Sequence, residues 1–165
     1  MPAERLELDT IRTTADAGRM IRSFGPGWNT AIAHGASTLT RDLDLAAPMT
    51  PENLARLLDA LRPLRPRHAL RPDLGELADP PERLATYHLL MLVTDLGRVD
   101  VIREVRPVGE YADLETVEME LVEHRVFKVL ALDQLIEVNG ALSRPKDRTV
   151  EAELRAIRDV LRDST

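Results

Sequence analysis

The chain contains no cysteine, few aromatic side chains and no long apolar run. Without cysteine it cannot form a disulfide, a thiolate zinc site or a cysteine nucleophile. One Trp, two Tyr and two Phe leave few rings on which nucleic-acid bases could stack. No apolar run approaches the ~18 residues that cross a membrane, and the opening residues Met-Pro-Ala-Glu-Arg carry no apolar segment. We therefore expect a cytoplasmic protein with no signal peptide and no membrane partner.

The composition is that of a globular protein. The chain has 165 residues, of which 44% are hydrophobic and 30% are charged. This length predicts a single domain over residues 1–165. The net charge of −6 argues against non-specific nucleic-acid binding by the whole surface. Four Arg and one His lie between Arg62 and Pro72. This basic segment is either a phosphate contact or a solvated connection, and its prolines favour the connection.

Two aspartates flank a leucine in the sequence Asp42-Leu43-Asp44. Side chains alternate along a strand, so both carboxylates would share one face while Leu43 and Leu45 point into a core. Like charges held side by side repel and need an opposite charge. Mg²⁺ or Mn²⁺ supplies that charge and prefers hard oxygen ligands. The alternative is a solvated strand that happens to carry two acids.

A third acid, Asp100, lies between Val99 and Val101 in a segment that the sequence predicts to be a strand. The apolar run 88–94, the turn Asp95-Leu96-Gly97 and the strand 98–102 together predict a β-hairpin in the middle of a sheet. A carboxylate inside an apolar strand is costly unless it is paired or bound to a metal. The alternative is an outward-facing position on a half-exposed strand.

The rest of the pattern predicts an α/β (α+β) fold, with a small mixed sheet of about four to six strands flanked by helices. Thr50 and Pro51 predict a helix start, with Thr50 as the cap. His34 is predicted to end a helix or to pack. The spacing of apolar residues predicts helices over 6–17, 28–33, 51–61, 132–142 and 150–161. Further strands are predicted over 20–24, 117–121 and 125–130. A loop is predicted over 75–83 and a helix break over 143–148.

The run HGASTLTRDLDL, residues 34–45, resembles the signature of the nucleotidyltransferase superfamily. More narrowly, it is similar to the small single-domain bacterial branch that includes abortive-infection toxin and antitoxin nucleotidyltransferases. The Gly97–Val101 strand and the Arg144-Pro145-Lys146-Asp147 segment continue the resemblance in the same order. The resemblance implies that Asp42, Asp44 and Asp100 are catalytic carboxylates and ligands to Mg²⁺ or Mn²⁺.

The same resemblance implies a nucleotide site and a reaction. The protein would transfer a nucleoside monophosphate from an NTP to a hydroxyl of an RNA (tRNA-like) or protein acceptor, and a cognate toxin or antitoxin would be a partner. Asp147 would orient Lys146 by a salt bridge, or would cap a helix. The residues placed near the NTP phosphates are Gly25, Gly27, Ser37 and Lys146.

Three departures from the family pattern favour an alternative function. Pro26 separates the two glycines, the arginine that family members often carry near Thr38 is missing, and Asn139 stands where they carry a lysine. The alternative is a catalytically impaired nucleotidyltransferase-fold module that binds or regulates a partner. A metal-dependent nuclease using the same carboxylates is a third interpretation, which the flanking residues fit less well.

Overall fold

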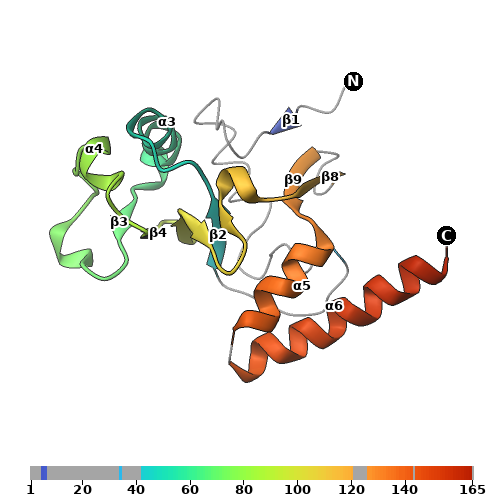
Figure 1. The fold of residues 1–165 in the computed structure, drawn as a ribbon. Helices are drawn as coiled ribbons and strands as arrows, with labels where there is room; N and C mark the ends of the chain where they lie inside the picture. The colour runs from blue at the N-terminus through green and yellow to red at the C-terminus, as the bar shows by residue number, and fades with distance from the viewer. Residues whose placement is uncertain (1–4, 7–33, 35–41, 121–125, 143, 165) are drawn as a thin grey trace.

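In the computed structural model, the described part of the chain forms a mixed β-sheet with helices on it (Figure 1). The structure describes residues 5–6, 34, 42–120, 126–142 and 144–164, and it describes the backbone alone for Arg5, Leu6, Asp42, Val126, Phe127 and Lys146. Glycines Gly25 and Gly27, Ser37 and the segments predicted over 20–24 and 28–33 lie outside the described residues. The strands are β1 (Arg5–Leu6), β2 (Asp42–Ala46), β3 (Arg67–His68), β4 (Leu89–Thr94), β5 (Gly97–Ile102), β6 (Glu104–Val105), β7 (Gly109–Glu110), β8 (Thr116–Glu120) and β9 (Val126–Leu130). The helices are α3 (Pro51–Leu61), α4 (Pro81–Leu84), α5 (Leu132–Ala141) and α6 (Pro145–Asp163), with 3-10 turns at Arg62–Leu64, Pro72–Leu74 and Tyr111–Asp113.

The main sheet has four strands in the order β2-β5-β4-β3. Strand β2 runs parallel to β5, whereas β4 pairs antiparallel with both β5 and β3. The predicted hairpin is confirmed, because β4 and β5 pair from Leu89 opposite Ile102 to Thr94 opposite Gly97. The Leu96 amide donates to Thr94 Oγ1 at 3.2 Å and closes the turn. Gly97 has a φ of +132°, a backbone conformation that favours glycine.

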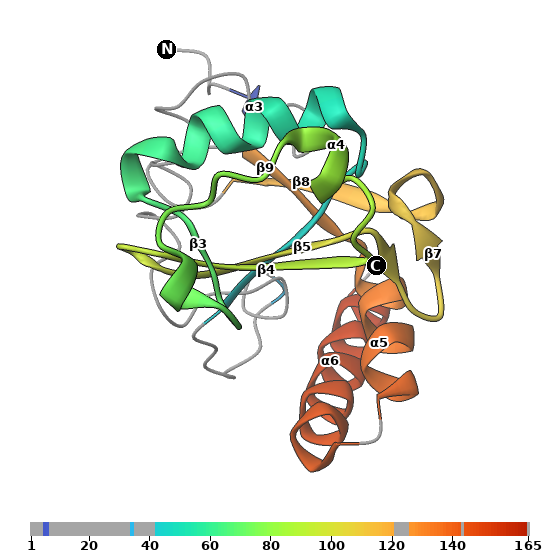
Figure 2. The ribbon, with the colours of Figure 1, turned by 90° about the vertical axis from the view of Figure 1, so that its left-hand side faces the viewer.

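Helices α3 and α4 cover one face of this sheet (Figure 2). The predicted start of α3 is confirmed, since Thr50 Oγ1 accepts a hydrogen bond from the Asn53 amide at 3.2 Å and Pro51 takes the first helical position. The apolar stripe of α3 then faces the strands, as its spacing predicts. The buried side chains shared by these helices and the sheet include Leu54, Leu57, Leu61, Leu84, Leu45, Leu90, Leu92, Val99 and Val101.

A second sheet has the order β1-β9-β8. Strands β8 and β9 pair antiparallel, which confirms the two strands predicted over 117–121 and 125–130 to within a residue or so. Helix α5 follows β9 directly and packs against α6 through Leu135, Ile136, Val150 and Leu154. The fold class is therefore a mixed α+β arrangement, as predicted. None of the helices in the described ranges combines the length and the apolar character needed to cross a membrane.

Three boundaries differ from the sequence-based prediction. Helix α6 begins at Pro145, so the predicted break over 143–148 is wrong from Pro145 onward. Proline starts a helix readily, because an N–H at the first helical position would have no partner within the helix. The predicted loop over 75–83 ends in the single turn of α4, which also begins at a proline. Leu6 lies in strand β1, and the rest of the helix predicted over 6–17 lies outside the described residues.

Candidate active site

The two acidic strands are neighbours, and their register brings the predicted carboxylates together. Strand β2 pairs parallel with β5, with Asp44 opposite Asp100 and Asp42 opposite Arg98. Residues in register on adjacent strands share a face of the sheet. Leu43 and Leu45 take the other face, next to Val99 and Val101, under the helices. Residues Asp42, Asp44, Arg98 and Asp100 therefore form one group on the face away from α3, which we call the carboxylate face.

Asp100 is buried, with 8% of its surface exposed, and it is paired with an arginine. Arg98 lies two residues earlier on β5, so it points to the same face. Its Nε donates to Asp100 Oδ1 at 2.9 Å and its Nη2 donates to Oδ2 at 3.0 Å. This two-bond geometry is the strong form of an arginine–carboxylate pair. The cost of an acid inside an apolar strand is thus offset by an ion pair within the chain.

The sequence-based reasoning missed Arg98, although the spacing contained the signal. In Gly97-Arg98-Val99-Asp100, the arginine and the acid are two residues apart on a predicted strand, which places them on one face. The counter-ion of Asp100 was therefore predictable from the sequence. Met91, opposite Asp100 on β4, lies beside the same guanidinium, with its sulfur 3.1 Å from Arg98 Nη2.

The donor chemistry of the carboxylate face fits a hard divalent cation. By register, the residues of this face include the acids Asp42, Asp44 and Asp100, and carboxylate oxygens are the ligands that Mg²⁺ and Mn²⁺ prefer. Asp44 is exposed, whereas Asp100 is buried. Within the residues that the structure describes, no group of three or more His, Asp or Glu side chains is arranged to hold a metal ion. The carboxylate of Asp42 lies outside that description.

The positions of the predicted phosphate-binding groups lie outside the description: Gly25, Gly27 and Ser37 are not among the described residues. Lys146 is the second residue of α6, and its side chain is not described. Asp147 is buried and accepts a hydrogen bond from Arg144 Nε at 2.8 Å, so its described ion pair is with Arg144. His34 places Nε2 2.8 Å from the Leu130 carbonyl oxygen, a contact in line with the predicted packing role.

The basic side chains of the segment 62–72 are paired with aspartates that lie outside it. Arg65 Nε donates to Asp95 at 2.7 Å, and this hydrogen bond lowers the pKa of the Asp95 carboxyl and raises the pKa of Arg65. The hydrogen bond from Arg71 likewise lowers the pKa of Asp73. The remaining pairs are Arg62 with Asp59, His68 with Asp79, and Arg67 with Asp95 at 3.7 Å. This pairing favours the structural role of the segment over a phosphate contact.

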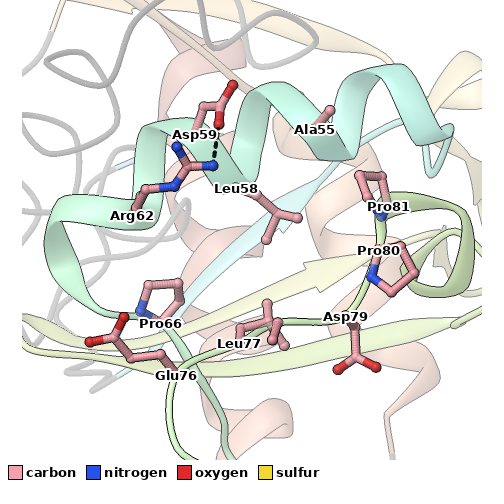
Figure 3. A pocket seen from close by; sticks show the side chains of 11 residues that line it. Ala55, Leu58, Asp59, Arg62, Pro66, Glu76, Leu77, Asp79, Pro80 and Pro81 are labelled. Carbon is pink, nitrogen blue, oxygen red and sulfur yellow. Dashed lines mark hydrogen bonds and ion pairs between the residues drawn. The ribbon is translucent and has the colours of Figure 1, made fainter.

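A cavity of about 500 Å³ lies between α3 and the segment 76–81 (Figure 3). Leu58 and Leu77 point into it, with Asp59 and Arg62 paired at its edge. Because α3 covers the opposite face of the sheet, this cavity is separate from the carboxylate face. Its walls are partly polar and partly apolar, and neither Asp44 nor Asp100 lines it.

No protein-family model, curated protein or solved structure matches this chain.

Proposed function

We propose that this protein is a metal-dependent nucleotidyltransferase of nucleotidyltransferase-like fold. It transfers a nucleoside monophosphate from an NTP to a hydroxyl of an RNA or protein acceptor and releases pyrophosphate. The observation that supports this proposal is the register of β2 and β5, which makes Asp44 and Asp100 direct neighbours and places Asp42 one step along the same face. Asp44 and Asp100 come from strands far apart in the chain, and two like charges in register on one sheet face are unfavourable unless a positive charge offsets them.

In this proposal, Asp42, Asp44 and Asp100 would hold Mg²⁺ or Mn²⁺. Bound there, the ions supply positive charge to the phosphate oxygens, where negative charge develops during transfer. The acceptor oxygen forms a bond to the α-phosphorus while the bond to the bridging oxygen breaks, and pyrophosphate leaves with the electron pair. Asp100 accepts the proton of the acceptor hydroxyl. Contacts from Gly25, Gly27, Ser37 and Lys146 to the NTP phosphates remain part of the proposal, as do the cytoplasmic location and a cognate toxin or antitoxin.

The first test is nucleotide binding. We expect calorimetry to detect binding of at least one NTP in the presence of Mg²⁺, with the binding lost in Asp42→Ala and in Asp44→Ala. Asp163→Ala removes the same charge from the end of α6 and serves as the matched control. An NTP that binds equally to all four proteins does not use the carboxylate face.

The second test is transfer itself. The protein is incubated with each NTP labelled at its α-phosphate, together with total RNA or total protein. We expect label to enter one of these acceptors and an equal amount of pyrophosphate to appear, both in a Mg²⁺-dependent manner. Release of nucleotides from RNA without added NTP would instead identify a nuclease.

The arginine on Asp100 favours a second candidate function. Both oxygens of this carboxylate accept hydrogen bonds from Arg98, which competes with a metal for the same atoms. A catalytically impaired module that binds a nucleotide or a partner protein fits this arrangement. It predicts nucleotide binding, or none, without transfer of label to any acceptor.

A further inference from the structure

Arg98 occupies the position on Asp100 that a metal ion would need. The guanidinium contacts both carboxylate oxygens at 2.9 and 3.0 Å, so Asp100 has a complete positive partner from its own strand. The side chain of Asp100 is 11% exposed, whereas that of Arg98 is 37% exposed. The acid is therefore fixed in the protein, and the arginine approaches it from the solvent side.

We propose that Arg98 is a positioning residue that neutralises and orients Asp100 in the metal-free protein and is displaced when a divalent cation binds. This inference rests on the proposed function, because it assumes that the carboxylate face takes a metal. It adds a residue that nothing in the family resemblance assigns. It also explains how a buried acid reserved for a metal is kept stable while the metal is absent.

The structure gives Arg98 a way to leave Asp100 without being buried. Its side chain is over a third exposed, and a long side chain of this kind can keep its charged end in water. Arg98 Nη2 also lies 3.1 Å from the Met91 sulfur, a weak hydrogen-bond acceptor. Asp42 is the register partner of Arg98 on β2, so a further aspartate stands opposite it on the neighbouring strand. Arg98 can therefore leave Asp100 and stay on the same face of the sheet.

The exchange has a thermodynamic consequence that can be measured without any enzymatic assay. If the metal must displace Arg98, removing the arginine tightens metal binding, and the metal-free protein loses stability because Asp100 is left buried and unpaired. We expect Arg98→Met to bind Mn²⁺ about ten-fold or more tightly than the wild-type protein, within the usual range of coupling between two sites. Electron paramagnetic resonance of free Mn²⁺ measures the affinity.

The same variant gives a second readout in thermal unfolding. Without metal, Arg98→Met is expected to melt at a lower temperature than wild type, and Mg²⁺ is expected to restore most of the loss. Arg98→Lys keeps the charge but loses the two-bond geometry, so its Mn²⁺ affinity should fall between the other two. This milder variant also keeps the test usable if Arg98→Met fails to fold.

The chain offers a closely matched control. Arg71 pairs with Asp73 at the same spacing of two residues and in the same two-bond geometry, at 3.0 and 2.9 Å, but on the exposed surface. Arg71→Met should leave Mn²⁺ affinity unchanged. If the wild-type protein binds Mn²⁺ in an Asp44-dependent manner and Arg98→Met binds it no more tightly, the inference fails and the proposed function stands. If neither protein binds Mn²⁺, both fail.

Discussion

Replacing Asp44 by Asn is expected to abolish the stabilisation of the protein by Mg²⁺. The substitution keeps the shape of the side chain and removes one of two negative charges that lie in register on β2 and β5. Neighbouring strands lie about 4.8 Å apart. At that separation two unit charges repel by about 0.9 kcal/mol in water, and by about 3.5 kcal/mol at an effective dielectric constant of about 20.

The lower end of this range applies here. Asp44 is exposed, and the charge of Asp100 is partly neutralised by Arg98. The relief of this repulsion therefore amounts to about 0.5–1 kcal/mol, which is small beside the gain expected from a bound metal ion. For the wild-type protein, a Mg²⁺ concentration of about 100 times its Kd adds about 2.7 kcal/mol of stability. The variant should show no such gain.

Urea unfolding in EDTA and in excess Mg²⁺ measures both effects. Asp163→Asn removes the same charge from the end of α6 and should leave the response to Mg²⁺ unchanged. An undiminished response to Mg²⁺ in Asp44→Asn would show that the metal binds elsewhere.

Three further predictions concern the fold itself. Leu54 lies on α3 and has no exposed surface, so Leu54→Ala should lower the free energy of unfolding by about 3 kcal/mol in urea titrations. A loss below about 1 kcal/mol would contradict its burial. Thr50→Ala removes the cap on the Asn53 amide and should cost about 1 kcal/mol, with Thr50→Ser restoring most of it. The hydrogen bond from Arg65 lowers the pKa of Asp95, so its stabilising effect is present above the unfolded pKa of about 3.9 and is lost as the pH falls through the folded value. Asp95→Asn should therefore melt below wild type at pH 7, and the two should converge in acid; a gap that persists in acid would refute this.

Elements with strong local signals were predictable from the sequence. The helix after Thr50 has both a side-chain cap and a proline that determine its start, and the hairpin 89–102 has a short polar turn between two apolar runs. Helix α6 was predicted too short because Pro145 was taken as a break. Proline breaks a helix only in its interior, and the sequence alone does not say which residue comes first. The one-turn helix α4 is too short to leave a periodic pattern.

The sequence by itself determined which acids belong to a candidate site and which face of its strand each one takes, because alternation along a strand is a local property of the backbone. It also contained the pairing of Arg98 with Asp100, since both lie on one strand. Only the tertiary structure decided that β2 pairs with β5, in parallel and in the register that places Asp44 beside Asp100. These two strands are separated by fifty residues of chain, and a shift of one residue would have turned one set of acids into the core. Burial of Leu43, Leu45, Val99 and Val101 under the helices excludes that shift, and so the packing of the apolar face determines the arrangement of charges on the other.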